Sequence, residues 1–336
     1  MRPALLFLFI SAACLAAQQP TLTGPVEAYT FDAPTRSLRA VFGFPGAATF
    51  GPALRSGLEF ASVAPLQNYA IGYQSSQCVL ISGLGSTLST RALSGVEARP
   101  GGIAWSGNGS LAILYSLSGN WLQTISGLPS SPVVGKRVDG SALGGVLASV
   151  AADAKGKQIA AGVTGDAGGV YQSSDGETFT SLKQVAKPVA LAFSIATGSN
   201  DSTTLYVLDA NVPEAIAINL SSHGYQSIAL SGLTNPVAVQ AVENSQNVQQ
   251  LYVAGASELR ILDVATQQIV SDVPLTFQAT GLAEFGSTSF VLAARVQQSN
   301  PLWLFSSTPQ PGAYFVPAIQ APSPAHGRSG LVRGER

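Results

Sequence analysis

One short apolar motif recurs six times along the chain, and this recurrence limits the possible folds more than any other feature. The copies read SVAPL, GIAWS, SVAAD, ALAFS, AVQAV and GLAEF, and their second residues are Val63, Ile103, Val150, Leu191, Val239 and Leu282. The intervals between them are 40, 47, 41, 48 and 43 residues. Each interval has room for four short strands with their turns, which is the length of one blade in a radially repeated sheet protein.

The order of strands and turns is similar within each interval. After Ile103 come the turn SGNG, the strand SLAILYS, the turn LSGN and the strand WLQTIS. Asn108-Gly109 is a typical hairpin dipeptide, and no segment shows helical periodicity. We therefore predict an all-β fold, a single β-propeller of four-stranded antiparallel blades. A β-sandwich is the structural alternative, but its strands do not recur in regular groups of four.

The residues before the first motif, from about Pro25 to Ala61, amount to nearly one more interval. We expect six complete repeats plus a partial N-terminal blade, which gives six or seven blades, with seven favoured. The segment FDAPTRSL at 31–38 matches LDVATQQI at 262–269 in an apolar-Asp-x-x-Thr frame. This match predicts that the chain opens with the third and fourth strands of a blade.

The first 17 residues are typical of a signal peptide. Arg2 precedes an apolar run from Ala4 to Ile10, and small residues surround an expected cleavage after Ala17. A lipid anchor on Cys14 is the disfavoured alternative, because Ser11 stands where a lipobox has Leu. We expect an exported protein, periplasmic or extracellular, with the propeller at 18–320 and a disordered tail at 321–336.

Composition excludes several classes of function. Removing Arg2 with the leader leaves 16 basic against 18 acidic residues, so no electrostatic field for nucleic acid arises. Charged residues make up 10% of the chain and hydrophobic residues 46%, which suits many buried strands and not disorder. We expect no membrane span, because polar residues or Gly interrupt every later apolar run. Cys78 would remain as a single buried thiol without a disulfide partner.

The fifth repeat, LYVAGASELRILDVATQQIVSDVPL at 251–275, resembles the bacterial YVTN-type, WD40-like propeller repeat. That repeat has a LYV strand, a strand that ends in an apolar residue and Asp, a Thr-containing turn and a further apolar strand. The resemblance implies a propeller, usually of seven blades, in exported or surface proteins. It identifies no ligand, because propellers host many unrelated activities.

Residues that could carry chemistry are few. The only histidines are His223, in a polar loop, and His326, in the tail, so a catalytic triad or a histidine metal site is disfavoured. YQSSDGETF at 171–179 resembles a sialidase Asp-box, which we interpret as a turn at Asp175-Gly176. Trp105, Trp121 and Trp303 could stack on sugars, but packing between blades is favoured. We assign no catalytic residue, cofactor or metal ligand.

Carboxylates are the remaining candidates. We expect Asp32, Asp209 and Asp263 to cap turns. Glu284 follows Leu282-Ala283 on an inner strand and could face the central channel, so it is the one candidate for a ligand-binding group.

We expect a noncatalytic binding scaffold that engages a protein, peptide or glycan. The alternative is a lactonase-like or other hydrolase with a divalent cation held by carboxylates in the channel. A third possibility is one subunit of a larger surface assembly. The sequence leaves the oligomeric state and the ligand open.

Overall fold

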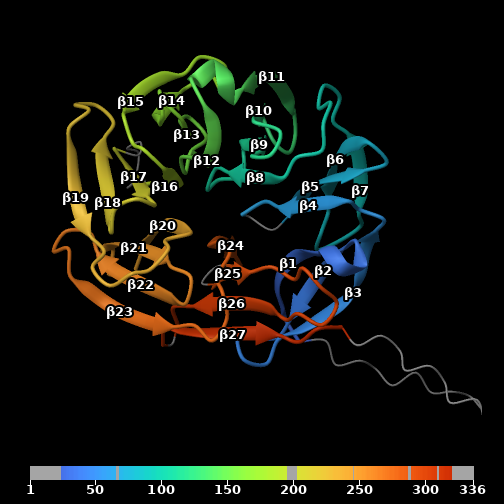
Figure 1. The fold of residues 1–336 in the computed structure, drawn as a ribbon. Helices are drawn as coiled ribbons and strands as arrows, with labels where there is room; N and C mark the ends of the chain where they lie inside the picture. The colour runs from blue at the N-terminus through green and yellow to red at the C-terminus, as the bar shows by residue number, and fades with distance from the viewer. Residues whose placement is uncertain are drawn as a thin grey trace, which may run out of the picture.

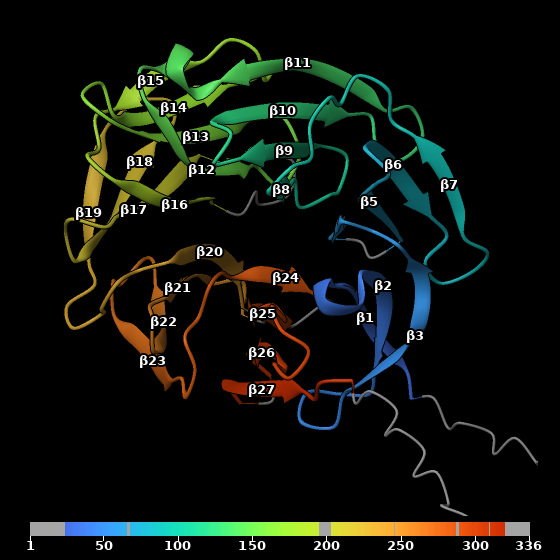
Figure 2. The ribbon, with the colours of Figure 1, turned by 45° about the vertical axis from the view of Figure 1, so that its right-hand side comes forward.

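The computed structural model describes residues 24–319 apart from 66–67, 195–202, 245, 287–288 and 309. Within these residues the chain forms seven antiparallel sheets arranged as a ring, which we number blades 1 to 7 in chain order (Figures 1 and 2). Blade 1 has three strands and each of the other blades has four. The expected β-propeller of six complete repeats and a partial N-terminal blade is confirmed, with seven blades.

Blades 1 to 4 comprise β1 (Val26–Asp32), β2 (Ser37–Phe42) and β3 (Thr49–Ser56); β4 (Phe60–Val63), β5 (Tyr69–Gln74), β6 (Gln77–Ser82) and β7 (Ser89–Ala92); β8 (Gly102–Trp105), β9 (Ala112–Ser116), β10 (Trp121–Ser126) and β11 (Val133–Asp139); and β12 (Val146–Ala152), β13 (Ile159–Thr164), β14 (Gly169–Ser173) and β15 (Thr180–Lys183).

Blades 5 to 7 comprise β16 (Pro188–Phe193), β17 (Thr204–Asp209), β18 (Glu214–Asn219) and β19 (Tyr225–Ala229); β20 (Ala238–Glu243), β21 (Gln249–Ala254), β22 (Glu258–Asp263) and β23 (Ile269–Pro274); and β24 (Ala283–Phe285), β25 (Ser289–Ala293), β26 (Leu302–Ser306) and β27 (Gly312–Val316). Two 3-10 helices, η1 (Ala33–Thr35) and η2 (Gly140–Leu143), lie in connections. Among the described residues, no helix is long and apolar enough to cross a membrane.

The recurring motif marks the first strand of blades 2 to 7, which is the strand nearest the centre of the ring (Figure 1). Its register is less regular than its sequence. In blades 3, 4 and 5 the backbone N–H that closes the first hairpin lies three residues after the motif's second residue. In blade 6 that N–H belongs to Asn244, five residues after Val239, and in blade 2 to Ala64, directly after Val63. The motif therefore identifies the strand but not the register.

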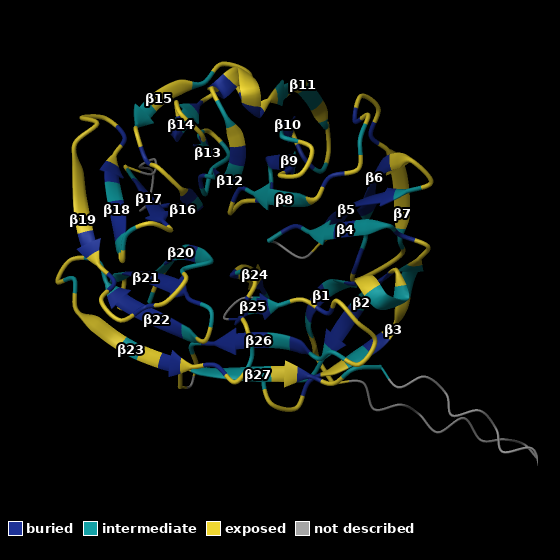
Figure 3. Cartoon of the chain, viewed as in Figure 1, coloured by how far each residue is buried: buried dark blue, intermediate teal, exposed yellow. Residues whose placement is uncertain are grey.

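Each blade buries both of its faces against its neighbours, as the continuous dark strands in Figure 3 show. In β17, Leu205 and Val207 pack toward blade 4 while Tyr206 and Leu208 pack toward blade 6. Because successive side chains of a strand point to opposite faces, a strand between two blades packs both sets of side chains against its neighbours. This explains why the middle strands of the repeats are mostly apolar on both faces.

Seven clusters of buried apolar side chains lie one at each of the seven contacts between blades, including the contact between blades 7 and 1. The ring is therefore closed by packing. The outermost strands are different, since β7 is exposed at each of its four residues and β19 at four of its five. The interior of this molecule lies between blades, and the outer strands meet solvent.

Blade 1 differs from the others in the direction of its first strand. Glu27, near the start of β1, accepts a hydrogen bond from the Ser289 hydroxyl at the start of β25. Asp32, at the end of β1, meets Arg295, two residues beyond the end of β25. β1 thus runs parallel to the second strand of blade 7. β1 also packs on β4, the first strand of the next blade. The second strands β13 and β17 pack in the same way on β16 and β20, the first strands of the blades that follow them.

The three strands of blade 1 therefore correspond to the second, third and fourth strands of the other blades. The prediction that the chain opens with third and fourth strands was wrong by one strand. Segment 31–38 turns from β1 into β2, whereas 262–269 turns from β22 into β23. In both, a Thr hydroxyl donates to the preceding Asp, Thr35 to Asp32 and Thr266 to Asp263. The shared pattern reports a kind of turn, which any hairpin can use.

Candidate functional site

Glu284 lies in the middle of β24, the inner strand of blade 7, and its surface is exposed to solvent. Its Oε1 accepts a hydrogen bond of 3.4 Å from Nε2 of Gln240, on the inner strand of blade 6. Surrounding strands nevertheless crowd the carboxyl, and the resulting loss of hydration raises its pKa above the usual glutamate value. Glu284 is therefore a partly desolvated carboxylate at the centre of the ring.

The surroundings of Glu284 do not offer the donor set of a divalent cation. Ca²⁺ sites gather six to eight oxygen ligands, several of them carboxylates. Within residues 24–319, as far as they are described, no three His, Cys, Asp or Glu side chains come together in a group that could hold a metal ion. The hydrogen-bond partner of Glu284 is an amide, so the structure adds no support for a metal-dependent reaction here.

The aspartates that sequence analysis singled out lie in turns. Asp209 Oδ1 accepts from the backbone N–H of Asn211, and Asp263 Oδ1 from that of Thr266. Asp175 accepts from two backbone N–H groups in the turn between β14 and β15, and these bonds hold its pKa well below the usual range. Asp32 accepts from the Thr35 hydroxyl in the turn between β1 and β2, and it differs from the others because it also belongs to a buried ion cluster.

The three tryptophans are engaged in packing. Trp105 donates its Nε1–H to the Ser62 hydroxyl at 2.9 Å and meets the Tyr69 ring edge-on, across the contact between blades 2 and 3. Trp121 belongs to the same apolar cluster. The Trp303 ring stacks on Phe277 with ring centroids 4.1 Å apart. Sugar stacking needs an uncovered aromatic face, so these contacts favour the packing role.

The remaining nucleophile and base candidates are isolated from one another. Cys78 is buried between blades 2 and 3, and burial raises the pKa of its thiol to about 12. A thiol of that pKa is not ionised near neutral pH and is a poor nucleophile. His223 lies in the exposed turn between β18 and β19 with φ of 58°. His326, Cys14 and the expected signal peptide lie outside the described residues.

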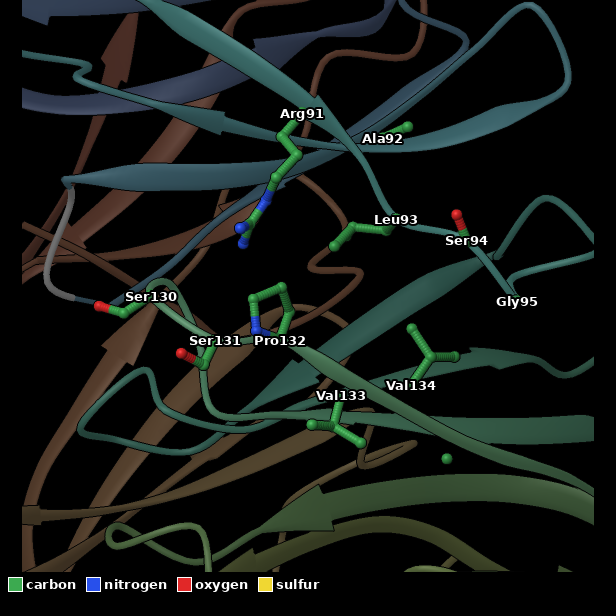
Figure 4. A pocket seen from close by; sticks show the side chains of 11 residues that line it. Arg91, Ala92, Leu93, Ser94, Gly95, Ser130, Ser131, Pro132, Val133 and Val134 are labelled. Atoms are coloured by element: carbon green, nitrogen blue, oxygen red, sulfur yellow. The ribbon is translucent and has the colours of Figure 1, made fainter.

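A groove lies between the outer strands of blades 2 and 3 (Figure 4). One wall runs from the end of β7 through Leu93 to Gly95, and the other from Ser130 into β11. Its volume is about 670 Å³, and it is open to solvent along its length. A smaller hollow of about 230 Å³ continues it past Gly95 and Gly135 toward Arg137.

Two side chains hold the walls of this groove together. The Nε2 group of Gln123 donates to the carbonyl oxygens of Gly95 and Gly135, at 2.9 Å each. Arg91 reaches across from blade 2 and donates from Nη2 to the carbonyl oxygen of Pro129, at 3.2 Å. The groove is therefore bridged from both blades and not only bounded by them.

The groove offers both apolar and basic contact groups. Val133 is 63% exposed on one wall, while Leu93 is buried beneath the other. Arg91, Lys136 and Arg137 line the groove and its continuation. The Lys136 ammonium lies 3.2 Å from the Glu177 carboxylate, and the Arg137 guanidinium lies over the Trp121 ring. Sequence analysis did not find this groove, because its two walls come from different repeats.

Sequence analysis also missed the ion cluster at the contact between blades 7 and 1. The Asp32 carboxylate lies 3.1 Å from Nε of Arg295 and 3.4 Å from Nε of Arg39. The side chains of Asp32 and Arg295 are 0% and 1% exposed. The Arg295 guanidinium also lies over the Phe50 ring of blade 1, 5.4 Å from its centroid. Residues so far apart in sequence carry no local signal of this contact.

No protein-family model matches the sequence, and no curated protein sequence matches it. Solved structures share its architecture. A functionally unknown protein from Desulfotomaculum acetoxidans DSM 771 matches with a TM-score of 0.57 and 10% identity, over 87% of this chain and 100% of that chain. Dihydro-heme d1 dehydrogenase NirN, in complex with DHE, matches with a TM-score of 0.50 and 14% identity, over 92% of this chain and 67% of that chain. At these identities the likeness shows the fold alone, which is the seven-bladed β-propeller.

Proposed function

We propose that this protein is an exported, noncatalytic binding scaffold of the YVTN-type propeller class, and that it engages a protein or peptide partner in the groove between blades 2 and 3. The leader-like first 17 residues and the LYV repeat at 251–275 support export and class. The observation that carries the function is the groove itself.

The shape of the groove favours a macromolecular partner. Small-molecule sites are concave and bury most of their ligand, whereas this groove is open along its length. Its bridging Arg91 is of a residue type that is enriched among the contacts that dominate protein interfaces, and its exposed Val133 adds apolar surface beside it. Basic side chains outnumber the one acidic side chain, Glu97, along the groove and its continuation, which favours a partner segment that carries carboxylates.

Selection of binders from a random peptide display library on the immobilised protein tests this proposal. We expect peptides with acidic and apolar residues, and about 10-fold or greater loss of their affinity in Val133→Asp and in Arg91→Glu. Val270→Asp is the matched control, since Val270 is 54% exposed on the outer strand β23, far from the groove. Equal loss in the control, or selected peptides whose affinity neither groove variant lowers, would contradict the proposal.

The alternative function is a lactonase-like or other hydrolase at the centre of the ring, and the raised pKa of Glu284 is the observation that favours it. Elemental analysis of the purified protein, with melting temperatures in Ca²⁺ and in EDTA, distinguishes the two. A bound divalent cation with turnover of sugar lactones that Glu284→Gln abolishes would establish the enzyme and overturn the scaffold.

A further inference from the structure

Arg91 is the one charged residue among the described residues that line the larger part of the groove between blades 2 and 3. Its exposed side chain projects from β7 across the groove toward segment 130–132 (Figure 4). The guanidinium donates to the carbonyl oxygen of Pro129 at 3.2 Å, and among the described residues it has no carboxylate within salt-bridge distance. Since a peptide carbonyl carries only a partial charge, the end of the groove at Arg91 is cationic.

At the other end of the groove, Lys136 already has a counter-charge from blade 4. Its ammonium lies 3.2 Å from Oε2 of Glu177, which belongs to the turn between β14 and β15. Oε1 of the same carboxylate accepts a hydrogen bond of 3.3 Å from the backbone N–H of Lys136. An exposed ion pair by itself contributes little stability, but the bond to the backbone keeps the carboxylate beside the ammonium. The charge of Lys136 is therefore cancelled locally.

Arg137, at the same end, is also engaged within the protein. Its guanidinium lies over the Trp121 ring, 5.0 Å from the ring centroid. The pKa of Asp139 lies below its usual value, chiefly because Ser141 donates hydrogen bonds to the carboxylate and also because the Arg137 charge is close. Glu97 places a further carboxylate in the hollow that continues the groove. This end is therefore balanced in charge, in contrast to the end at β7.

The two walls of the groove fit one extended chain. The carbonyl oxygens of Gly95 and Gly135 come close together, because both accept from Nε2 of Gln123 at 2.9 Å. The bridge from Arg91 to Pro129 crosses the groove four residues earlier on the first wall. An extended chain rises about 3.3 Å per residue, so about four residues of a partner fit between the two crossings. The groove is open along its length, so a partner chain can pass through it without ending there.

We propose that the groove takes an extended segment of a partner protein with one acidic side chain, that this carboxylate binds the Arg91 guanidinium, and that Glu177 confines recognition to this end by holding Lys136. A carboxylate accepts two parallel hydrogen bonds from a guanidinium, so it replaces the single bond to Pro129 with a stronger pair. An Asp or Glu side chain is the source, because the groove does not close around a chain end. This inference rests on the proposed function and names the group by which the partner is recognised.

Affinities of the library-selected peptides for charge variants of the full chain test this proposal. Arg91→Gln in the protein and acid-to-Gln in the peptide should each weaken binding about tenfold, and the two changes together should weaken it little further. A peptide whose acidic residue is changed to Lys should bind Arg91→Glu more tightly than it binds the parent protein, which a merely structural role of Arg91 would not produce. Lys136→Gln should weaken binding less than about threefold. Additive losses, or an equal loss in Lys136→Gln, would overturn the proposal.

The source of the carboxylate is tested with the same peptides. Amidation of the peptide's C-terminus removes the terminal carboxylate and leaves the acidic side chain, so the affinity should not change. A tenfold loss on amidation would assign Arg91 to a chain terminus and overturn the proposal.

Glu177→Gln tests the part of the proposal that concerns Lys136. Peptides selected again on this variant should show a second acidic position, and a peptide with two carboxylates should bind it about threefold more tightly than it binds the parent. Glu243→Gln is the matched control, because Glu243 is exposed on blade 6, and it should change neither result. Unchanged selection on Glu177→Gln, or a loss of affinity for every peptide, would overturn the proposal.

The inference and the proposed function fail in different ways. Peptides that lose affinity in Val133→Asp but keep it in Arg91→Gln would leave the groove as the binding site and overturn only this inference. Peptides that neither Val133→Asp nor Arg91→Glu weakens would overturn the proposed function, and this inference with it.

Discussion

The contact between blades 5 and 6 and the contact between blades 7 and 1 both join neighbouring blades, but their chemistry differs. Thirteen buried apolar side chains fill the first, against seven in the second. The second also buries Asp32, Arg295 and part of Arg39. Blades 5 and 6 are consecutive in sequence, whereas blades 7 and 1 are brought together only by closing the ring. Where the apolar contact is smallest, an ion cluster links the ends of the chain.

This difference indicates that apolar burial supplies most of the stability of the ring, whereas the ion cluster makes the contact between its first and last blades specific. Apolar burial is favourable in proportion to area and has no preferred partner. A buried ion pair gains little net free energy, because desolvation offsets its attraction, but the loss of one member leaves a charge unpaired. The contact between blades 7 and 1 should therefore be selective for its partner and sensitive to single substitutions.

The largest effect is expected from Arg295→Met, which leaves the buried carboxylate of Asp32 with Arg39 as its remaining salt-bridge partner among the described residues. We expect a loss of about 3–5 kcal/mol in the free energy of unfolding, measured by urea denaturation. Arg260→Met is the matched control, because Arg260 is also buried but its partner Asp272 has a side chain 45% exposed to water. That variant should lose about 1–2 kcal/mol. Equal losses would show that the closing contact has no special sensitivity.

Apolar truncations compare the two contacts directly. Leu208→Ala, between blades 5 and 6, should cost about 3–4 kcal/mol, because the residue is 0% exposed within the larger cluster. Leu304→Ala, between blades 7 and 1, should cost about 2–3 kcal/mol, because fewer apolar neighbours surround it. Thermal and urea unfolding of both variants measure this order. The reverse order would mean that the closing contact carries more apolar stabilisation than its cluster indicates.

Trp105→Phe removes one of the hydrogen bonds that cross the largely apolar contact between blades 2 and 3. The Ser62 hydroxyl loses its Trp105 donor, and we expect a loss of about 1 kcal/mol beyond that of the smaller ring. The double variant Trp105→Phe with Ser62→Ala isolates the bond by a mutant cycle. If the coupling free energy between Trp105 and Ser62 were as large as that between Asp32 and Arg295, the hydrogen-bonded contact and the ionic contact would not differ in sensitivity.

The smallest effect is expected from Glu284→Gln, on the side of blade 7 away from the ion cluster. Since the raised pKa of Glu284 means that the folded state keeps this proton to higher pH, stability from this group falls as pH rises above the usual glutamate range. Gln does not titrate. The difference in melting temperature, variant minus parent, should therefore be more positive at pH 8 than at pH 4. A difference that does not change with pH would show that the carboxyl is fully hydrated.

Much of the fold could be predicted because each blade repeats the same local physics. The recurring motif located the inner strands of six blades, and the share of hydrophobic residues, 46%, indicated many buried strands. The position of blade 1 could not be obtained in this way. Asp32 with Thr35 and Asp263 with Thr266 form similar turns, so the local pattern did not reveal which strand of the blade came first.

The candidate site was less accessible to prediction. Glu284 was singled out from its place on an inner strand, and the structure supplies its partner Gln240 and the crowding that raises its pKa. The groove was invisible in the sequence, because Arg91 and Val133 come from different repeats and are ordinary surface residues in each. The groove exists only because the outer strands of two neighbouring blades lie apart in the folded ring.

The sequence by itself determined the all-β class, the length of a blade and the inner strand of each complete repeat, because these depend on spacing and on side chains that alternate along a strand. The tertiary structure alone decided that β1 takes the place of a second strand in its blade, that Asp32 meets Arg295, and that a groove lies between blades 2 and 3. Those features depend on how blades pack around the ring, and contacts between distant repeats have no local period in the sequence.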